Sequence, residues 1–117
     1  MEIRGRIHQA VQGVVVISDT TPLPIIAGRT GKTLFLNYLE LSWSDVFTST
    51  ANAYLSDGSG GTDWWNVEFY SNPSYQPRAY SINFGEYGFA LTESNGLFGR
   101  TTTADMDFTV VALGYYK

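Results

Sequence analysis

The stretch Trp64-Trp65-Asn66-Val67-Glu68-Phe69-Tyr70 decides the fold class of this chain. Trp65, Val67 and Phe69 alternate with the residues between them, and the side chains of a β-strand point alternately to the two faces of its sheet. The alternation predicts a half-buried strand. It also predicts that Trp64 and Trp65 point to opposite faces, so that one of them lies outside the core.

Similar short segments lie on both sides of this strand. They are rich in β-branched and aromatic residues, which suit a pleated surface. Clusters of Gly, Pro, Asn, Asp and Ser separate them and mark turns. The further predicted strands are residues 14–17, 50–56, 79–84, 89–93 and 107–116.

Residues 33–43 are ambiguous, because their leucines fit either one stripe of a helix or a long strand. Alternation as a strand would place Phe35, Leu39 and Trp43 on one face and Leu34 and Leu36 on the other. Polar residues interrupt both faces. We favour the strand, because every neighbouring segment is a strand and a lone helix would lack a partner. Seven or eight short strands indicate an all-β fold, an antiparallel β-sandwich or barrel.

The composition excludes several classes of function. Charged residues are only 15% of the 117, against about 25% in an average soluble domain. A net charge of -4 argues against nucleic acid as a partner, because such proteins usually carry a basic surface. The chain has no cysteine, which removes disulfides, thiolate metal sites and cysteine nucleophiles. No apolar run reaches the ~20 residues of a membrane helix.

Four motifs suggest chemistry, and each has a plainer interpretation. Gly28-Arg29-Thr30-Gly31-Lys32-Thr33 departs from the phosphate-binding pattern G-x-x-x-x-G-K-[ST], so we expect a turn that enters a strand. Asp57 and Asp63 flank a glycine-rich loop without the spacing of a calcium loop, which favours a solvated hairpin. Two further acids, Asp105 and Asp107, fit surface charge at a strand entry.

The fourth motif is the only histidine, His8, which has no partners for nucleophilic or metal chemistry. We therefore predict that the protein is not an enzyme and has no catalytic residue, metal site or cofactor. The first residues and the short run 14–17 do not form a signal-peptide core, so we expect synthesis in the cytoplasm. Residues 1–10, which include Arg4 and Arg6, are expected to form an N-terminal arm ahead of one domain at residues 11–117.

The order of several segments resembles the small jelly-roll structural proteins of tailed bacteriophages, which are head decoration (cement) proteins or fibre and spike tips. The matching residues are Ile26-Ala27-Gly28, Gly31-Lys32, Leu34 to Leu41, Gly88-Phe89-Ala90-Leu91-Thr92 and Gly114-Tyr115-Tyr116. The pattern spans about residues 20–117 and is made of common residue types. The family has no catalytic residues to transfer. The resemblance implies a jelly-roll type of sandwich and a location in the virion.

The resemblance also implies a homotrimer that decorates or stabilises a capsid, with the major capsid protein or another virion protein as partner. Aromatic residues make up 15% of the chain, and Tyr and Trp are favoured at interfaces as well as in cores. The alternative is a carbohydrate-binding or receptor-binding module at a fibre tip, which would stack an exposed aromatic ring on a glycan. The candidate interface residues are Arg4, Arg6, Trp64, Tyr115 and Tyr116.

Overall fold

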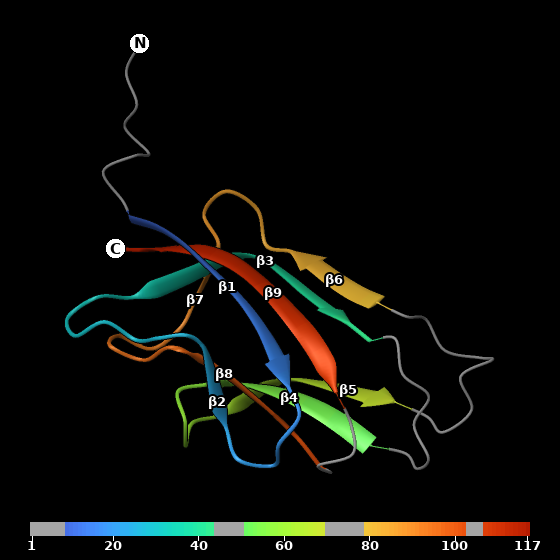
Figure 1. Cartoon of the computed structure of the whole chain (residues 1–117). Helices are drawn as coiled ribbons and strands as arrows, with labels where there is room; N and C mark the ends of the chain where they lie inside the picture. Colours follow the sequence, from blue (N-terminus) through green and yellow to red (C-terminus); the bar gives the residue numbers. More distant parts are fainter. Residues whose placement is uncertain (1–8, 44–50, 70–78, 103–106) are drawn as a thin grey trace.

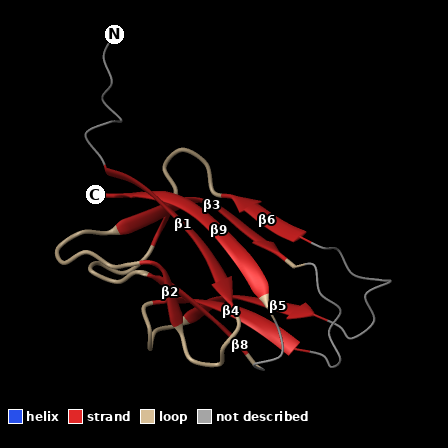
Figure 2. Cartoon of the chain, viewed as in Figure 1, coloured by secondary structure: helices blue, strands red, loops and turns tan. Residues whose placement is uncertain are grey.

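The computed structural model describes residues 9–43, 51–69, 79–102 and 107–117, and all regular secondary structure in these ranges is β-strand (Figure 2). The predicted all-β class is confirmed. The ambiguous residues 33–43 form a strand. The strands are β1 (Gln9–Ile17), β2 (Leu23–Ile26), β3 (Leu34–Ser42), β4 (Ala51–Asp57), β5 (Asp63–Phe69), β6 (Ala79–Asn83), β7 (Phe89–Ala90), β8 (Leu97–Thr101) and β9 (Phe108–Tyr116).

The strands form two antiparallel sheets that pack as a sandwich (Figure 1). The larger sheet has the order β1-β9-β3-β6, with the short β7 also paired to β3. The smaller sheet has the order β2-β8-β4-β5. Apart from the two-residue β7, this is the strand order of a jelly roll, with the first and last strands side by side in one sheet. Strands β2 and β8 were not predicted from the sequence.

Strand β1 begins at Gln9, which pairs with Tyr116 of β9. The last two residues of the expected arm, Gln9 and Ala10, are thus part of the sheet. Residues 1–8, with Arg4, Arg6 and His8, lie outside the described residues. At the middle of β1, a Cβ on Gly13 would lie only 2.1 Å from the carbonyl oxygen of Ile25, so the edges of the two sheets approach closely there.

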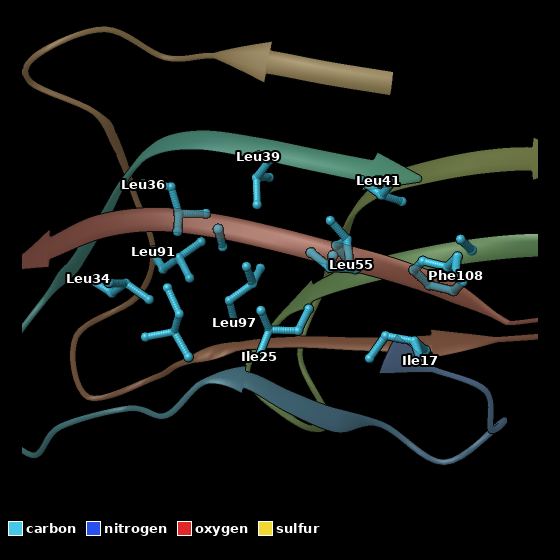
Figure 3. Packing of buried hydrophobic residues seen from close by; sticks show 14 of the residues in the cluster. Ile17, Ile25, Leu34, Leu36, Leu39, Leu41, Leu55, Leu91, Leu97 and Phe108 are labelled. Carbon is cyan, nitrogen blue, oxygen red and sulfur yellow. The ribbon is translucent and has the colours of Figure 1, made fainter. Parts of the chain in front are cut away.

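The core lies between the sheets and is made almost entirely of aliphatic side chains (Figure 3). Strand β9 shows the alternation that the sequence predicts. Phe108, Val110 and Ala112 are buried, whereas Thr109 and Val111 on the other face are half-buried. Both sheets contribute buried leucines, among them Leu39 of β3 and Leu55 of β4.

A bulge at Asn37 explains why the periodicity of β3 is ambiguous. The register against β9 shifts between Leu36 and Tyr38, so Asn37 is an extra residue. Leu34 and Leu36 are buried before the bulge, and Leu39 and Leu41 are buried after it. The buried positions therefore change from even to odd numbers within one strand, which no single alternation can describe.

A second bulge corrects the prediction for the two tryptophans. Trp65 pairs with Leu55, but Asp63 pairs with Ser56, which leaves Trp64 as the extra residue of β5. Both indole rings contact Phe89, Trp64 at 5.1 Å and Trp65 at 5.5 Å between ring centroids. The prediction of opposite faces is therefore wrong. A bulge redirects the side chain that it carries, which regular alternation does not anticipate.

Candidate functional site

The candidate interface residues have different environments. Arg4 and Arg6 lie outside the described residues. Trp64 is exposed, with 47% of its surface accessible, and Tyr115 is half-buried. Tyr116 belongs to the core, with 8% exposed. The alternation within β9 turns Tyr116 inward, because it lies on the same face as Phe108 and Val110.

Both C-terminal tyrosines are held by contacts within the chain. The Tyr115 hydroxyl donates a hydrogen bond of 2.7 Å to the carbonyl of Tyr87, and its ring stacks on Phe35 at 5.1 Å. The Tyr116 hydroxyl donates to the carbonyl of Ala27 at 2.5 Å. These contacts fasten the loops on both sides of β9 to the sheet.

The outer face of the larger sheet carries a group of aliphatic side chains on β1 and β9. Val14 and Val16 of β1 are 58% and 56% exposed, and Leu113 of β9 is 39% exposed. Val14 pairs with Val111, so these side chains are neighbours across the two strands. We name Val14, Val16, Val111 and Leu113 the aliphatic face. Contiguous exposed apolar surface of this kind marks sites of interaction.

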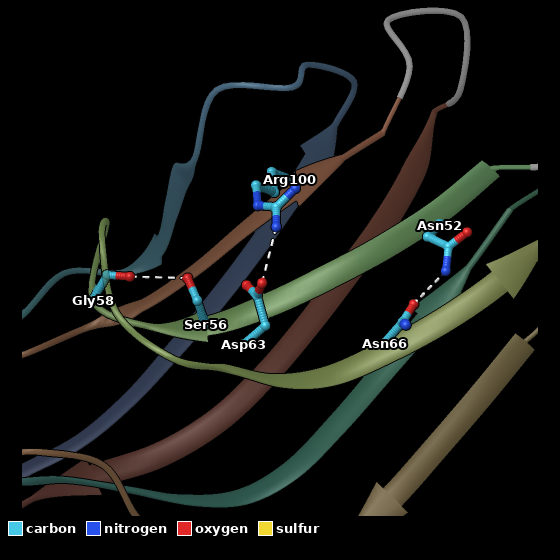
Figure 4. Close-up of polar contacts among 6 residues, drawn as sticks. All are labelled: Asn52, Ser56, Gly58, Asp63, Asn66 and Arg100. Carbon is cyan, nitrogen blue, oxygen red and sulfur yellow. Dashed lines mark hydrogen bonds and ion pairs between the residues drawn. The ribbon is translucent and has the colours of Figure 1, made fainter.

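The outer face of the smaller sheet is polar, and its side chains bind one another (Figure 4). Asn52 donates a hydrogen bond of 2.6 Å to Asn66. Arg100 forms an ion pair of 2.9 Å with Asp63, and its guanidinium lies 4.2 Å from the ring centre of Tyr54. The aliphatic face therefore lies on the larger sheet, whereas the outer face of the smaller sheet carries polar side chains that bind one another.

Aromatic rings fill the lateral side of the sandwich that lies away from β1 and β2, where β5 and β6 are the edge strands. Trp65, Phe84 and Phe89 contact one another with centroids 5.5–5.7 Å apart and connect the two sheets. Outside this cluster, large side chains remain accessible on β5, on β6 and on the loop from β6 to β7. We name them the aromatic edge: Trp64 (47% exposed), Tyr80 (39%), Ile82 (38%) and Tyr87 (81%).

The end of the sandwich near Trp64 is organised by the carboxylate of Asp57. It is 4% exposed and accepts hydrogen bonds from the amide and hydroxyl of Thr92, at 2.9 and 2.7 Å, and from the Asn95 side chain at 3.0 Å. Burial by itself raises the pKa of Asp57. The hydrogen bonds from Thr92, Asn95 and Trp64 outweigh burial and hold the pKa below its usual value of 3.8.

The structure separates the acids that were considered as cation ligands. Asp57 is committed to Thr92 and Asn95, whereas Asp63 binds Arg100. Asp107 is exposed, and Asp105 lies outside the described residues. Across the described ranges, no three His, Asp or Glu residues come together as a metal-binding group. The described part of the chain also has no helix that could span a membrane.

Residues 28–33 form the expected turn into a strand. The amide of Lys32 donates to the carbonyl of Arg29 at 3.0 Å, and β3 begins at Leu34. The amide of Gly31 donates to the side-chain oxygen of Ser94 at 2.9 Å. This amide is thus already occupied by the chain itself.

The aliphatic face was not predicted from the sequence, although a signal for it was present. A strand with one buried face shows alternation, but residues 14–17 are continuously apolar. Val15 and Ile17 point inward, so Val14 and Val16 must point outward. An uninterrupted apolar run on an edge strand therefore indicates that both faces are apolar. No local signal announces the Asp57 contacts, because Thr92 lies 35 residues away.

No family model and no curated relative matches this sequence. Function is therefore inferred from the fold, the surfaces and the sequence resemblance.

Proposed function

We propose that this protein is a non-enzymatic structural component of a phage virion that assembles as a homotrimer and decorates or stabilises the capsid. The aliphatic face is the observation that carries the proposal. Burial of apolar surface contributes about 25 cal/mol per Å². A second protein surface over Val14, Val16 and Leu113 would therefore stabilise an assembly.

Two further observations support the virion. Jelly rolls are common in viral capsids as well as in lectins. The segments that carry the resemblance also occupy buried positions: Leu34 and Leu36 are buried in β3, and Gly114 and Tyr116 are buried in β9, the strand between β1 and β3. The partner on the particle would be the major capsid protein or another virion protein.

Light scattering of the purified protein tests self-association. We expect a mass of about three times 13.0 kDa at micromolar concentration, because the resemblance implies a trimer and closed cyclic symmetry is the usual way to bury an apolar surface. A monomer would refute self-association. Cosedimentation with undecorated capsids tests the location, and failure to bind them would refute the decoration role.

A carbohydrate-binding module at a fibre tip is the second candidate, and Trp64 is the observation that favours it. Its ring is exposed, yet it is held edge-on against Phe89 with an interplanar angle of 77°. Such a fixed ring can stack on a sugar. Titration with glycans should then change tryptophan fluorescence saturably, and Trp64→Ala should abolish the change. A Tyr54→Ala variant, changed on the polar face, serves as the control.

A further inference from the structure

The indole of Trp64 is exposed and at the same time fixed in position. The bulge of β5 turns this side chain out of the alternation of its strand. Its ring meets Phe89 at an interplanar angle of 77°, and its N–H donates a hydrogen bond to the carboxylate of Asp57. Nearly half of its surface is nevertheless accessible. Bulges are frequent next to active sites, where they aim a side chain. These contacts therefore hold an open aromatic surface in one orientation.

The loop before Trp64 leaves the ring accessible. Residues 58–62 have the sequence Gly-Ser-Gly-Gly-Thr, with no side chain larger than threonine. The base of the loop is held, because the amide of Gly58 donates to the carbonyl of Gly96 at 2.8 Å. The hydroxyl of Ser56 also donates to the carbonyl of Gly58 at 2.9 Å (Figure 4). A short loop of small residues, held at its base, leaves room for a ligand on the indole.

The carboxylate that binds the indole N–H carries a charge without a basic partner. Asp57 forms no ion pair with any residue that the structure describes. Its hydrogen-bond donors, on Thr92, Asn95 and Trp64, are all neutral. The pKa of Asp57 lies below 3.8, so the group is ionised at neutral pH. A negative charge therefore lies directly beside the exposed ring.

The other charges near the ring do not cancel this one. Asp63 is paired with Arg100 at 2.9 Å, so these two charges neutralise each other (Figure 4). Glu93 is exposed on the loop from β7 to β8. Lys32 meets the same loop, because its carbonyl accepts a hydrogen bond of 2.7 Å from the amide of Ser94. Glu93 and Lys32 have opposite signs, and the buried carboxylate is left as the excess charge.

A carboxylate on the N–H strengthens the attraction of an indole for cations. The face of an indole carries partial negative charge and attracts a cation within about 6 Å of the ring centre. The carboxylate polarises the ring through the hydrogen bond and adds its own field, which is screened less because the group is buried. The face of Trp64 therefore favours a positively charged ligand over a neutral ligand of the same shape.

We propose that the ligand of Trp64 is a cationic sugar, an oligosaccharide of amino sugars with free ammonium groups. This inference rests on the carbohydrate-binding function proposed above and adds the charge of the ligand. A pyranose ring stacks on the indole, and an ammonium group lies at the ring in the field of Asp57. The carboxylate itself does not touch the sugar, because donors from Thr92 and Asn95 occupy its oxygens. Asp57 is a positioning residue that acts through Trp64.

Three trisaccharides separate the effect of charge from that of stacking. The trimers of glucosamine and N-acetylglucosamine and the glucose trimer cellotriose share one backbone and differ at carbon 2, which carries an ammonium, an acetamide or a hydroxyl group. Isothermal titration calorimetry measures their binding at pH 6, where the amines are protonated, at low and at high salt. Spermidine, a cation with three amines and no sugar ring, is the control for general attraction to an acidic protein.

We expect the glucosamine trimer to bind about tenfold more tightly than the other two sugars. High salt should reduce this preference, because it screens the attraction between charges. Trp64→Ala should abolish the binding of all three sugars. Equal affinities for the three sugars would overturn the cationic ligand but leave carbohydrate binding intact. Spermidine that binds as tightly as the glucosamine trimer would also overturn the cationic sugar. Binding of none of the sugars would refute the carbohydrate-binding function and this inference with it.

Two variants show whether Asp57 is the source of the preference. Asp57→Asn removes the charge beside the indole, so the affinity for the glucosamine trimer should fall to that for cellotriose. Glu93→Gln removes an exposed charge from the neighbouring loop and is the matched control, which should keep the preference. If Asp57→Asn does not fold, Trp64→Phe replaces it, because it keeps a ring without the N–H, and it should reduce the ratio of the two affinities. An unchanged ratio in the folded variant, or a ratio lost in Glu93→Gln, would contradict the role of Asp57.

Discussion

Replacement of Asp57 by asparagine tests how the end of the sandwich is held together. The amide oxygen of asparagine can still face the two donors of Thr92, but without charge each bond weakens by about 1 kcal/mol. The amide nitrogen of the new asparagine would face the side-chain nitrogen of Asn95, which in the wild type donates to the Asp57 carboxylate at 3.0 Å. Two opposing buried donors cost about 1–3 kcal/mol. We therefore expect Asp57→Asn to lower the free energy of unfolding by about 3–5 kcal/mol.

Urea denaturation followed by circular dichroism, at one fixed chain concentration, measures this loss. Asp63→Asn is the matched control, because it removes a carboxylate whose ion pair with Arg100 is about one-third exposed, at 34% and 32%. Exposed pairs contribute about 0–1 kcal/mol, so the control should change little. A loss below about 1 kcal/mol for Asp57→Asn would refute the view that this carboxylate organises the loops.

The same variant predicts a pH dependence. Because the pKa of Asp57 in the folded protein lies below 3.8, its ionised form stabilises the fold at pH values above 3.8. This stabilisation is lost as the pH falls through the folded pKa. The stability curves of wild type and Asp57→Asn should therefore converge in acid. If the curves of wild type and Asp57→Asn stayed parallel from pH 7 to pH 3, the Asp57 carboxylate would have the same pKa in the folded and the unfolded protein, which would refute this prediction.

Three further substitutions test the core and the loops. Val110→Asp places a charge at a position with 0% exposure and should prevent folding, seen as loss of the soluble protein; a stable variant would show that β9 is peripheral. Gly96→Ala brings a Cβ to 2.3 Å from the Ile26 carbonyl and should lower the melting temperature, whereas Gly60→Ala meets nothing within 4 Å and should not. Tyr116→Phe removes the bond to the Ala27 carbonyl and should cost about 1 kcal/mol in urea denaturation; equal stability would contradict that contribution.

The fold class was predictable because most strands show alternation or a high content of β-branched and aromatic residues in their own sequence. In β5, Trp65, Val67 and Phe69 alternate with polar residues, and β9 is rich in β-branched and aromatic residues. Strands β2 and β8 were missed for a physical reason. Pro24 interrupts the first, and Gly99 and Arg100 interrupt the second. Both segments become strands because β8 pairs with β2 on one side and with β4 on the other. The hydrogen bonds of this pairing compensate for their weak local preference for strand.

The candidate site was less predictable than the fold. The exposure of Trp64 was anticipated, but for the wrong reason, because a bulge rather than alternation directs its side chain. Tyr116 was expected at an interface and lies in the core, on the inward face of β9 with Phe108 and Val110. The alternation of this strand already implied that direction, whereas the bulge at Trp64 depends on long-range pairing that a local pattern does not show.

The bulge at Asn37 also has a consequence for how the chain reaches this fold. Strand β3 consists of two half-strands whose inward positions are out of phase by one residue. If β3 slid along β9 by one residue, both half-strands would turn their leucines outward. If it slid by two residues, Asn37 at the bulge would move away from the loop at Gly85 and Glu86. The hydrogen bonds from its side chain to the two carbonyls of that loop would then be lost. The central strand therefore has a single productive alignment, and misaligned folding intermediates lack the contacts that would make them persist.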